Sequence, residues 1–355
     1  MKIINIGSYP PPFGGVSNHL KRLREYLEKE NIKNELIDLS NYRSDEKINN
    51  RIRNISWKKT ILYLLFQKKA ILHFHNFSWK NTFIYYILGF KHFTILSFHN
   101  ERFLSEIEKT PRILQKLIVK CINSMNYVIV DSSKCCIIAE EIIENKSKIF
   151  IIPEFIPPSE ISRLDGESLI TNMRKKHKFL ISSNAFQICF HNGVDLYGID
   201  MLIKLTARLN KENIDTAFCF LLPKIGNNSY FLKLKEEIIR LNIPDRFIFI
   251  TNPLKEASSL WKVSDLFIRA TNTDGNSLSV LESLSIRTPV IASNCVPRPE
   301  GVVLFKTRDF DDLQKKTKMA LLNIDKFKNK LKNTKIENNA YKIIRFYKSI
   351  NVKGE

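Results

Sequence analysis

A rigid proline segment and two glycines join the first apolar run of the chain to an amphipathic helix. The run is Ile3–Ile6, the loop is PPPFGG at 10–15, and apolar residues recur at helical spacing from Val16 onward. Free backbone N–H groups and the positive end of a helix suit such a junction to an anion, which Gly14 and Gly15 allow to approach closely. The same residues also suit a tight turn that binds nothing, because the spacing of a dinucleotide-binding glycine motif is missing.

Histidines form a second group of residues that could do chemistry. His73 and His75 share one face of a predicted strand, and His99, followed by Asn100, ends the next strand. Two histidines could bind a metal ion, but no third ligand stands nearby, so no metal site is predicted. His19 lies one turn into the first helix, where it either reaches a substrate or covers the sheet.

Two carboxylates in the second half of the chain are separated by seven residues. Asp274 opens a loop that leads to a predicted helix N-terminus near Ser277, and Glu282 lies further along that helix between small serines that leave room for a ligand. Without a ligand, Asp274 would cap the helix through an Asx turn and Glu282 would be a solvated or paired carboxylate. The acidic run DFDD at 309–312 looks like a metal-binding motif, but it precedes a helix, whose dipole acidic residues complement.

The chain has a large excess of positive charge. It contains 56 Lys and Arg against 36 Asp and Glu among 355 residues, a net charge of +20. Such an excess indicates nucleic acid, anionic lipid or a phosphorylated substrate as a partner, unless an AT-rich genome has inflated the lysine content. Nothing in the sequence resembles a nucleic-acid-binding motif.

The distribution of these cations favours a membrane surface. Arg112, Lys116 and Lys120 recur at every fourth position of a predicted helix, opposite Ile113 and Leu117. More cations surround an apolar run upstream: Lys47, Arg51, Arg53, Lys58, Lys59, Lys68 and Lys69. A basic amphipathic surface suits anionic headgroups, although an ordinary solvated helix face has the same pattern.

Apolar runs alternate with amphipathic segments along the chain, which predicts buried parallel strands with helices between them. The strands of the first half begin near residues 3, 35, 70, 93, 127 and 148, and prolines near 153–158 mark a boundary. A second series of strands is expected at 186–193, 216–223, 246–251, 265–270, 289–293 and 301–305. The sequence therefore predicts two Rossmann-like, doubly wound α/β domains, 1–160 and 161–337, that face a central cleft, with the helix at 338–355 returning to the first domain.

Composition and cysteine usage set further limits. The chain is 44% hydrophobic and 11% aromatic, which is ample for two packed cores. Its six cysteines form no CxxC pair, and its longest apolar stretches fall far short of the roughly 20 residues that span a bilayer. A reduced, cytoplasmic protein is expected.

The stretch 265–305, together with PPPFGGVS, SFHN, IPEFIPP and NGVDLYGIDMLIKL, resembles glycosyltransferase family 4, in the right order and over nearly the whole chain. The resemblance implies a GT-B fold, a retaining mechanism and a nucleotide-sugar donor. It makes Asp274, Glu282 and His99 the catalytic candidates, with His99 near the reacting sugar and Glu282 on the ribose hydroxyls. The donor-binding loop and helix start would comprise Gly275, Asn276, Ser277 and Leu278, besides Glu282.

This chain departs from the family pattern. Asp274 replaces the usual Glu, and Asn192 and Tyr197 stand where the family has an Arg and a Lys that hold the donor diphosphate. Arg298 and Lys224 are the candidates to supply the missing charge, and Arg298 is preferred because a guanidinium matches phosphate oxygens in pairs. Asn192, Lys224 and Arg298 are therefore expected donor ligands, helped by helix-terminus amides.

The resemblance predicts a hexosyl- or related transferase that needs no metal. It would move a sugar from a nucleotide sugar to a membrane-presented, polyprenyl-diphosphate-linked saccharide in surface polysaccharide biosynthesis, as a peripheral protein on the inner face of the cell membrane. Gly14, Gly15, His19 and Asn100 are expected on the acceptor side. Two alternatives stay open, namely a nucleotide-sugar epimerase with the same fold and a non-catalytic basic scaffold.

Overall fold

The computed structural model describes residues 2–352 except 12–13, 41, 43–51, 161–167, 253, 255 and 276. The chain divides into two compact units. The first comprises Met1–Ser159 and Glu337–Glu355, and the second comprises Glu160–Ile336. The C-terminal helix thus belongs to the first unit.

The first unit is built on a seven-stranded parallel sheet in the order β3-β2-β1-β4-β5-β6-β7. Apolar residues fill both faces of its central strands, as expected for a sheet that is covered on both sides. The strands are β1 (Lys2–Gly7), β2 (Asn34–Asp38), β3 (Arg53–Asn54), β4 (Ala70–Phe74), β5 (Phe93–Phe98), β6 (Tyr127–Val130) and β7 (Ile149–Ile151).

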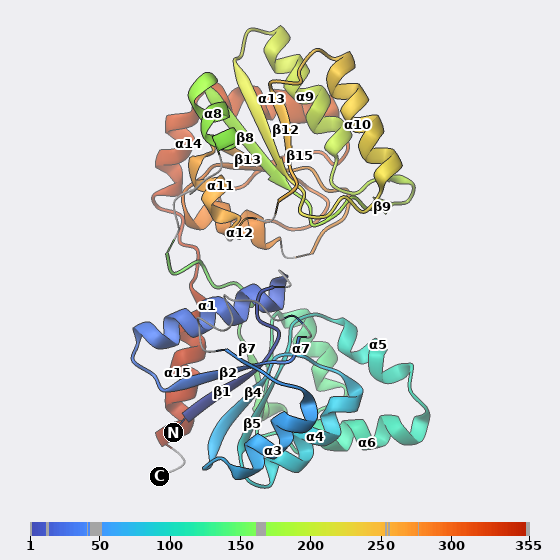
Figure 1. Cartoon of the computed structure of the whole chain (residues 1–355), viewed down its shortest axis with the longest axis vertical. Coiled ribbons are helices and arrows are strands. Elements are labelled where there is room, and N and C mark those ends of the chain that lie inside the picture. The colour runs from blue at the N-terminus through green and yellow to red at the C-terminus, as the bar shows by residue number, and fades with distance from the viewer. Residues whose placement is uncertain are drawn as a thin grey trace. The chain divides into compact units, whose positions relative to one another are not determined.

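Helices cover the two faces of this sheet unequally (Figure 1). One face packs against α3 (Trp57–Phe66), α4 (Trp79–Gly89), α5 (Arg102–Glu108), α6 (Arg112–Asn123) and α7 (Ser133–Glu140). The other face packs against α1 (Gly15–Lys29) and α15 (Asn339–Val352). The amphipathic tail is therefore a structural part of the first unit, where Asn339 also donates to the carbonyl oxygen of Phe155 at 3.0 Å.

The second unit has a six-stranded parallel sheet in the order β12-β11-β8-β13-β14-β15. Its strands are β8 (Phe179–Asn184), β11 (Thr216–Leu221), β12 (Phe247–Ile250), β13 (Leu266–Arg269), β14 (Val290–Ser293) and β15 (Val303–Phe305). Its helices are α8 (Ser168–Lys176), α9 (Ile199–Lys211), α10 (Asn228–Arg240), α11 (Ser258–Val263), α12 (Leu278–Ser285), α13 (Phe310–Leu322) and α14 (Ile324–Leu331). One hydrophobic cluster packs on each face of this sheet. The sheet is therefore covered by helices on both faces, so it too is doubly wound.

The prediction of a strand at 186–193 is wrong. The central strand is β8, which ends at Asn184, and the expected segment instead contains the short hairpin strand β9 (Phe190–His191). Ser182 and Ser183 of β8 are buried, and these two polar residues mask the apolar run that normally indicates a buried strand.

Helix α6 also differs from the expected pattern. Arg112, Lys116 and Lys120 are exposed as predicted, but Ile113 and Leu117 are exposed as well, and Ile118 lies in the core. Residues one position apart differ by only about 100° around a helix, so the apolar pair lies beside the basic stripe. Among the described residues, no helix is long and apolar enough to span a bilayer.

Candidate functional site

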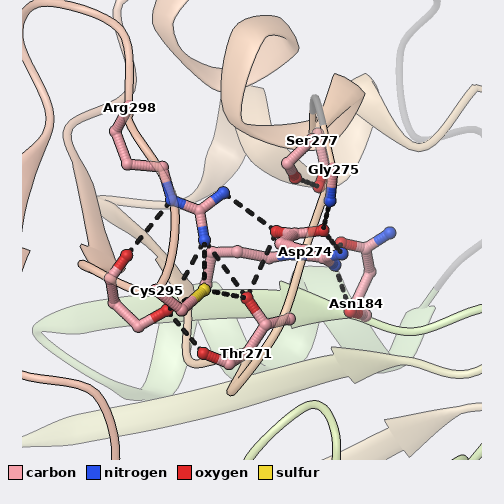
Figure 2. Close-up of polar contacts among 10 residues, drawn as sticks. Asn184, Thr271, Asp274, Gly275, Ser277, Cys295 and Arg298 are labelled. Carbon is pink, nitrogen blue, oxygen red and sulfur yellow. Dashed lines mark hydrogen bonds and ion pairs between the residues drawn. The ribbon is translucent and has the colours of Figure 1, made fainter.

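The carboxyl ends of β8, β13 and β14 bring polar residues together around the carboxylate of Asp274 (Figure 2). Arg269, the last residue of β13, donates from Nε to Oδ2 of Asp274 at 3.0 Å and from Nη2 to Oδ1 at 3.1 Å. Nη1 of Arg298 donates to Oδ2 at 2.9 Å. Asp274 therefore lies between two arginines, and the three side chains have a net charge of +1.

Further hydrogen bonds occupy the Asp274 carboxylate. The hydroxyl of Thr271 donates to Oδ2 at 3.2 Å, and the backbone N–H of Gly275 donates to Oδ1 at 3.1 Å. Burial would raise the pKa of Asp274, but the hydrogen bonds and positive charges of Arg269 and Arg298 hold it below its usual value. The carboxylate is thus ionised and already accepts hydrogen bonds from several protein groups. This geometry does not support the catalytic role expected for Asp274, and Ser277 rather than Asp274 is the N-cap residue of α12.

Arg298 does not present its guanidinium to solvent. Nε donates to the carbonyl oxygen of Ser293 at 3.2 Å and Nη2 to Oγ1 of Thr271 at 3.1 Å, in addition to the bond with Asp274. Its side chain is 2% exposed. The expectation that Arg298 binds a donor diphosphate directly has no support in this geometry, because the side chain is buried and each of its three nitrogens already donates to a group inside the unit.

Arg269 is a residue of this cluster that the sequence interpretation missed. Besides its bidentate contact with Asp274, it donates to the carbonyl oxygen of Asn184 at 3.1 Å, and its guanidinium lies 5.1 Å from the ring centre of Tyr197. An arginine at the end of an otherwise apolar strand was the available signal. The ring of Tyr197 therefore makes a cation–π contact with the Arg269 guanidinium.

Helix α12 begins at Leu278, shortly after Asp274 in the chain. Gly275 is exposed, and Ser277 is the N-cap residue of the helix that begins at Leu278. The hydroxyl of Ser277 contacts that of Ser279 rather than capping a backbone N–H. Asn276 lies outside the described residues. Within the predicted donor loop, Gly275 therefore leaves the backbone accessible close to a helix N-terminus.

Glu282 is buried in α12. Its Oε2 accepts a hydrogen bond from Nε1 of the fully buried Trp261 at 3.1 Å. One carboxylate oxygen is therefore fixed by the indole, which orients the side chain.

Asn192 has a local structural reason for its identity. Asn192 and Gly193 form the two-residue turn between β9 and β10 (Val194–Asp195), with φ angles of 51° and 74°. Positive φ at both positions defines a hairpin turn that favours Asn-Gly. The expected role of Asn192 in donor binding has no support in this geometry. Lys224, by contrast, is exposed in the loop after β11.

The first unit has its own pocket, of about 330 Å³, at the carboxyl ends of β4 and β5. This volume is at the lower end of the range for small-molecule sites, roughly 300–1,000 Å³. Aromatic rings and amide, hydroxyl, imidazole and carboxylate groups line it together: Val16, His75, Asn76, Phe77, Ser78, Asn81, Ser97, Phe98, His99, Asn100, Phe103 and Glu106. Such a mixture of hydrogen-bonding groups and ring faces suits a saccharide.

A network of buried histidines lies behind this pocket. The strand register pairs Asn5 with His73, whose ring nitrogens contact the hydroxyls of Tyr347 and Ser97. Nε2 of His75 donates to Oδ1 of Asn5 at 3.0 Å, because an amide oxygen only accepts. Burial holds the pKa values of His73 and His75 well below the usual range. The two histidines predicted as a conceivable metal pair are thus neutral members of a hydrogen-bond network.

The network fixes the orientation of His99. Nδ1 of the neutral His75 accepts from Nε2 of His99 at 3.2 Å, and Nδ1 of His99 lies 3.5 Å from Oε1 of Glu154. Burial would raise the pKa of Glu154, but His99 lowers it below its usual value. Both ring nitrogens of His99 therefore face protein groups, so the geometry does not support a direct catalytic contact by this ring.

His19 joins the same cluster. Its Nδ1 donates to the carbonyl oxygen of Glu154 at 2.7 Å, and its ring centre is 5.2 Å from that of His99. Burial lowers the pKa of His19 to about 4. His19 therefore ties α1 to the segment after β7. Among the described residues, no group of three or more His, Cys, Asp or Glu side chains could hold a metal ion.

The glycine loop and the remaining acidic motif are shaped by helix capping. Gly14 is the N-cap residue of α1, and its N–H donates to Oγ of Ser17 at 2.9 Å. Gly15 begins the helix, and residues 12–13 of the loop lie outside the described residues. The DFDD run lies at the start of α13, as predicted, and Asp309 also caps this helix by accepting from the N–H of Asp312 at 3.0 Å. Asn100 lines the pocket and also accepts from the N–H of Arg102.

Comparison with known proteins gives a family match over part of the chain. Residues 172–342 match the family model described as glycosyl transferases group 1. No curated protein matches the chain significantly in sequence. The matched segment contains Arg269, Asp274, Glu282 and Arg298.

Solved structures resemble the whole chain. A glycosyltransferase from Rickettsia africae ESF-5 aligns with a TM-score of 0.68 at 14% identity, covering 98% of both chains. Anabaena HepE, solved with UDP and with UDP-glucose, aligns at 0.62 and 13% identity over 98% of this chain and 100% of that one. A UDP-forming trehalose-phosphate synthase from Burkholderia xenovorans aligns at 0.64 and 11% identity over 97% and 99%. The chain therefore has the two-domain GT-B fold, and the partial match to the glycosyl transferases group 1 model covers most of its second unit.

Proposed function

We propose that this protein is a retaining glycosyltransferase that moves a sugar from a nucleotide-sugar donor to a saccharide acceptor. The observation that carries the proposal is the family match over residues 172–342, because the matched segment includes the polar cluster at the carboxyl ends of β8, β13 and β14. Ligands of open parallel α/β sheets bind at that edge.

The second unit would bind the donor. The exposed turn at Gly275 and the N-terminal amides of α12 suit a diphosphate, and the net positive charge of the Arg269–Asp274–Arg298 triad favours an anion nearby. Lys224 adds an exposed cation, and Glu282, oriented by Trp261, would accept hydrogen bonds from the ribose. Asp274 acts as a positioning residue, since it holds both arginines and the loop.

The first unit would bind the acceptor in its pocket. Asn81 and Glu106 offer hydrogen-bonding groups, and the stacked rings of Phe98 and Phe103, 3.9 Å apart, support the apolar part of the lining. We further propose that the acceptor is a saccharide carried on a polyprenyl diphosphate at a membrane, as in surface polysaccharide biosynthesis. The support for this part is the excess of positive charge, which suits an anionic surface.

Transfer can be tested directly. The protein is incubated with a panel of nucleotide sugars, beginning with UDP-glucose, with and without membrane extract, and nucleoside diphosphate release and the product's anomeric configuration are measured. We expect release that depends on the extract and a glycoside with the anomeric configuration of the donor. A change of donor stereochemistry without an acceptor would indicate an epimerase, and neither product would indicate a scaffold.

Variants localise the acceptor. Asn81→Ala and Glu106→Gln should raise the apparent KM for the acceptor and leave nucleotide affinity unchanged. Glu108→Gln is the matched control, because Glu108 is exposed on the same helix as Glu106 and does not line the pocket. Unchanged acceptor kinetics in both pocket variants would remove the pocket from the proposal.

A further inference from the structure

Three neighbouring helices of the first unit expose large apolar side chains to solvent. Helix α4 contacts both α3 and α6, and the three lie along one side of the first unit in Figure 1. Phe66 at the end of α3 is 81% exposed, Phe90 after α4 is 79% exposed, and Ile113 in α6 is 78% exposed. Leu62 and Ile87 are exposed on the same helices. Large apolar side chains exposed on adjoining helices indicate an interaction surface.

Specific contacts bring part of this apolar set together. The ammonium group of Lys91 donates to the carbonyl oxygen of Leu65, and His92 donates from Nε2 to that of Leu64 at 2.9 Å. These bonds tie the end of α3 to the turn after α4. Phe66 and Phe90, which adjoin the bonded residues, are therefore held at the same end of the helical layer.

The same helices have no negative charge. No Asp or Glu occurs in residues 57–100 or 112–123. The exposed cations on the three helices are Lys58, Lys59, Lys80, Arg112, Lys116 and Lys120. None of the last three forms an ion pair within the described part of the chain, so their charges are available to an external anion.

Exposed apolar residues on one helix of the second unit have a different setting. Helix α10 in the second unit exposes Leu232 and Ile239, but Glu236 and Glu237 lie between them on that helix. The absence of carboxylates from the α3–α4–α6 surface is therefore not a general property of exposed apolar sites in this chain. A surface that has cations and no carboxylates is complementary in charge to an anionic bilayer.

We infer that the outer surface of α3, α4 and α6 docks on an anionic lipid bilayer. The lysines and Arg112 bind the headgroups, while Phe66, Phe90 and Ile113 insert between them. Aliphatic and aromatic side chains beside cations on one helix layer are the arrangement of interfacial membrane proteins. The inference rests on the proposed function for the reason to be at a membrane, and it adds the surface that contacts the lipid.

Vesicle sedimentation tests the docking without donor or acceptor. The full chain is mixed with vesicles of phosphatidylcholine alone or with phosphatidylglycerol. We expect binding that needs the anionic lipid and weakens with salt, as the Debye length falls from about 30 Å to about 8 Å. Arg112→Gln/Lys116→Gln/Lys120→Gln should weaken the affinity roughly 100-fold, since each surface cation contributes about fivefold. Phe66→Ser/Phe90→Ser/Ile113→Ser should weaken it at every salt concentration.

Matched controls change the same residue types outside the surface. Leu232→Ser/Ile239→Ser and Lys233→Gln/Lys326→Gln/Lys330→Gln should bind vesicles like the parent. The inference is overturned if the apolar triple variant also binds like the parent, or if that variant turns a self-associated protein into a monomer. Vesicle binding without sugar transfer would leave the docking surface intact and contradict only the proposed function.

Discussion

Nη1 of Arg298 lies 2.9 Å from Oδ2 of Asp274, and the arginine side chain is almost completely buried. The same carboxylate oxygen is 3.0 Å from Nε of Arg269. The two arginines and the aspartate therefore form a buried, hydrogen-bonded group at the end of β13, and this arrangement favours a structural role for Arg298.

Arg298→Gln should strongly destabilise the second unit. Hydrogen bonds to a charged group typically contribute about 1.5–3 kcal/mol, and in this variant the Ser293 carbonyl oxygen and Thr271 lose their charged partner, while Asp274 keeps its ion pair with Arg269. Chemical unfolding followed by hydrogen exchange of β13 and β14 measures the effect. Arg208→Gln is the control, because Arg208 is exposed on α9. A variant with parental stability and a selectively raised Kd for UDP would mean that Arg298 serves the ligand instead.

Glu282→Gln should weaken nucleotide binding with little effect on stability. The amide oxygen can still accept the hydrogen bond from Trp261, while the loss of a charged acceptor for ribose hydroxyls costs about 1–3 kcal/mol. Calorimetric titration with UDP measures the change, and thermal unfolding serves as the control. Parental affinity for UDP in this variant would exclude the ribose contact.

The first unit should lose stability as the pH falls from about 7 to 5. Burial lowers the pKa of His19 to about 4 from a reference value of 6.5, so the unfolded chain takes up a proton in this range and the folded chain does not. Linkage for His19 alone then removes about 2 kcal/mol by pH 5. His73 and His75 act in the same direction, since their pKa values are also lowered. The lowered pKa of Glu154 adds a loss only below about pH 4.5, where the unfolded carboxylate is protonated.

Hydrogen exchange resolves this effect by unit. Protection in β4 and β5, corrected for the intrinsic pH dependence of exchange, should fall more than protection in β11. Asp215 lies beside β11. Burial would raise its pKa, but hydrogen bonds from His177, Lys178 and Arg246 lower it to about 2, so the contribution of Asp215 to the stability of the second unit is lost only at lower pH. His19→Gln should flatten the response of the first unit. Equal losses in both units would contradict the assignment.

Sugar transfer should not need a divalent metal. The diphosphate leaving group would be stabilised by helix N-terminal amides and by the net positive charge of the Arg269–Asp274–Arg298 triad. These groups can take the place of a metal ion. Activity should therefore persist in EDTA. Loss of activity on chelation, with recovery in manganese or magnesium, would show that a metal takes part.

The sequence by itself determined the architecture and the region of the site. Apolar runs that alternate with amphipathic helices predict two parallel α/β sheets, and the motif resemblance selects the loop at Asp274 and the helix with Glu282. The position of the acidic run 309–312 at the start of a helix was also predictable, because the run and the helix are adjacent in the chain.

Only the tertiary structure decided which groups are available for chemistry. Arg298 is 24 residues from Asp274 and His99 is 55 residues from Glu154, and each pair meets because separate strands end at the same edge of a sheet. Periodicity assigns a residue to a face of its own element, but hydrogen-bond partners and burial depend on which elements pack together. For this reason the sequence alone could suggest a phosphate ligand for Arg298 and a sugar ligand for His99, but it could not predict that the Arg298 guanidinium contacts Asp274 or that the His99 imidazole contacts His75 and Glu154.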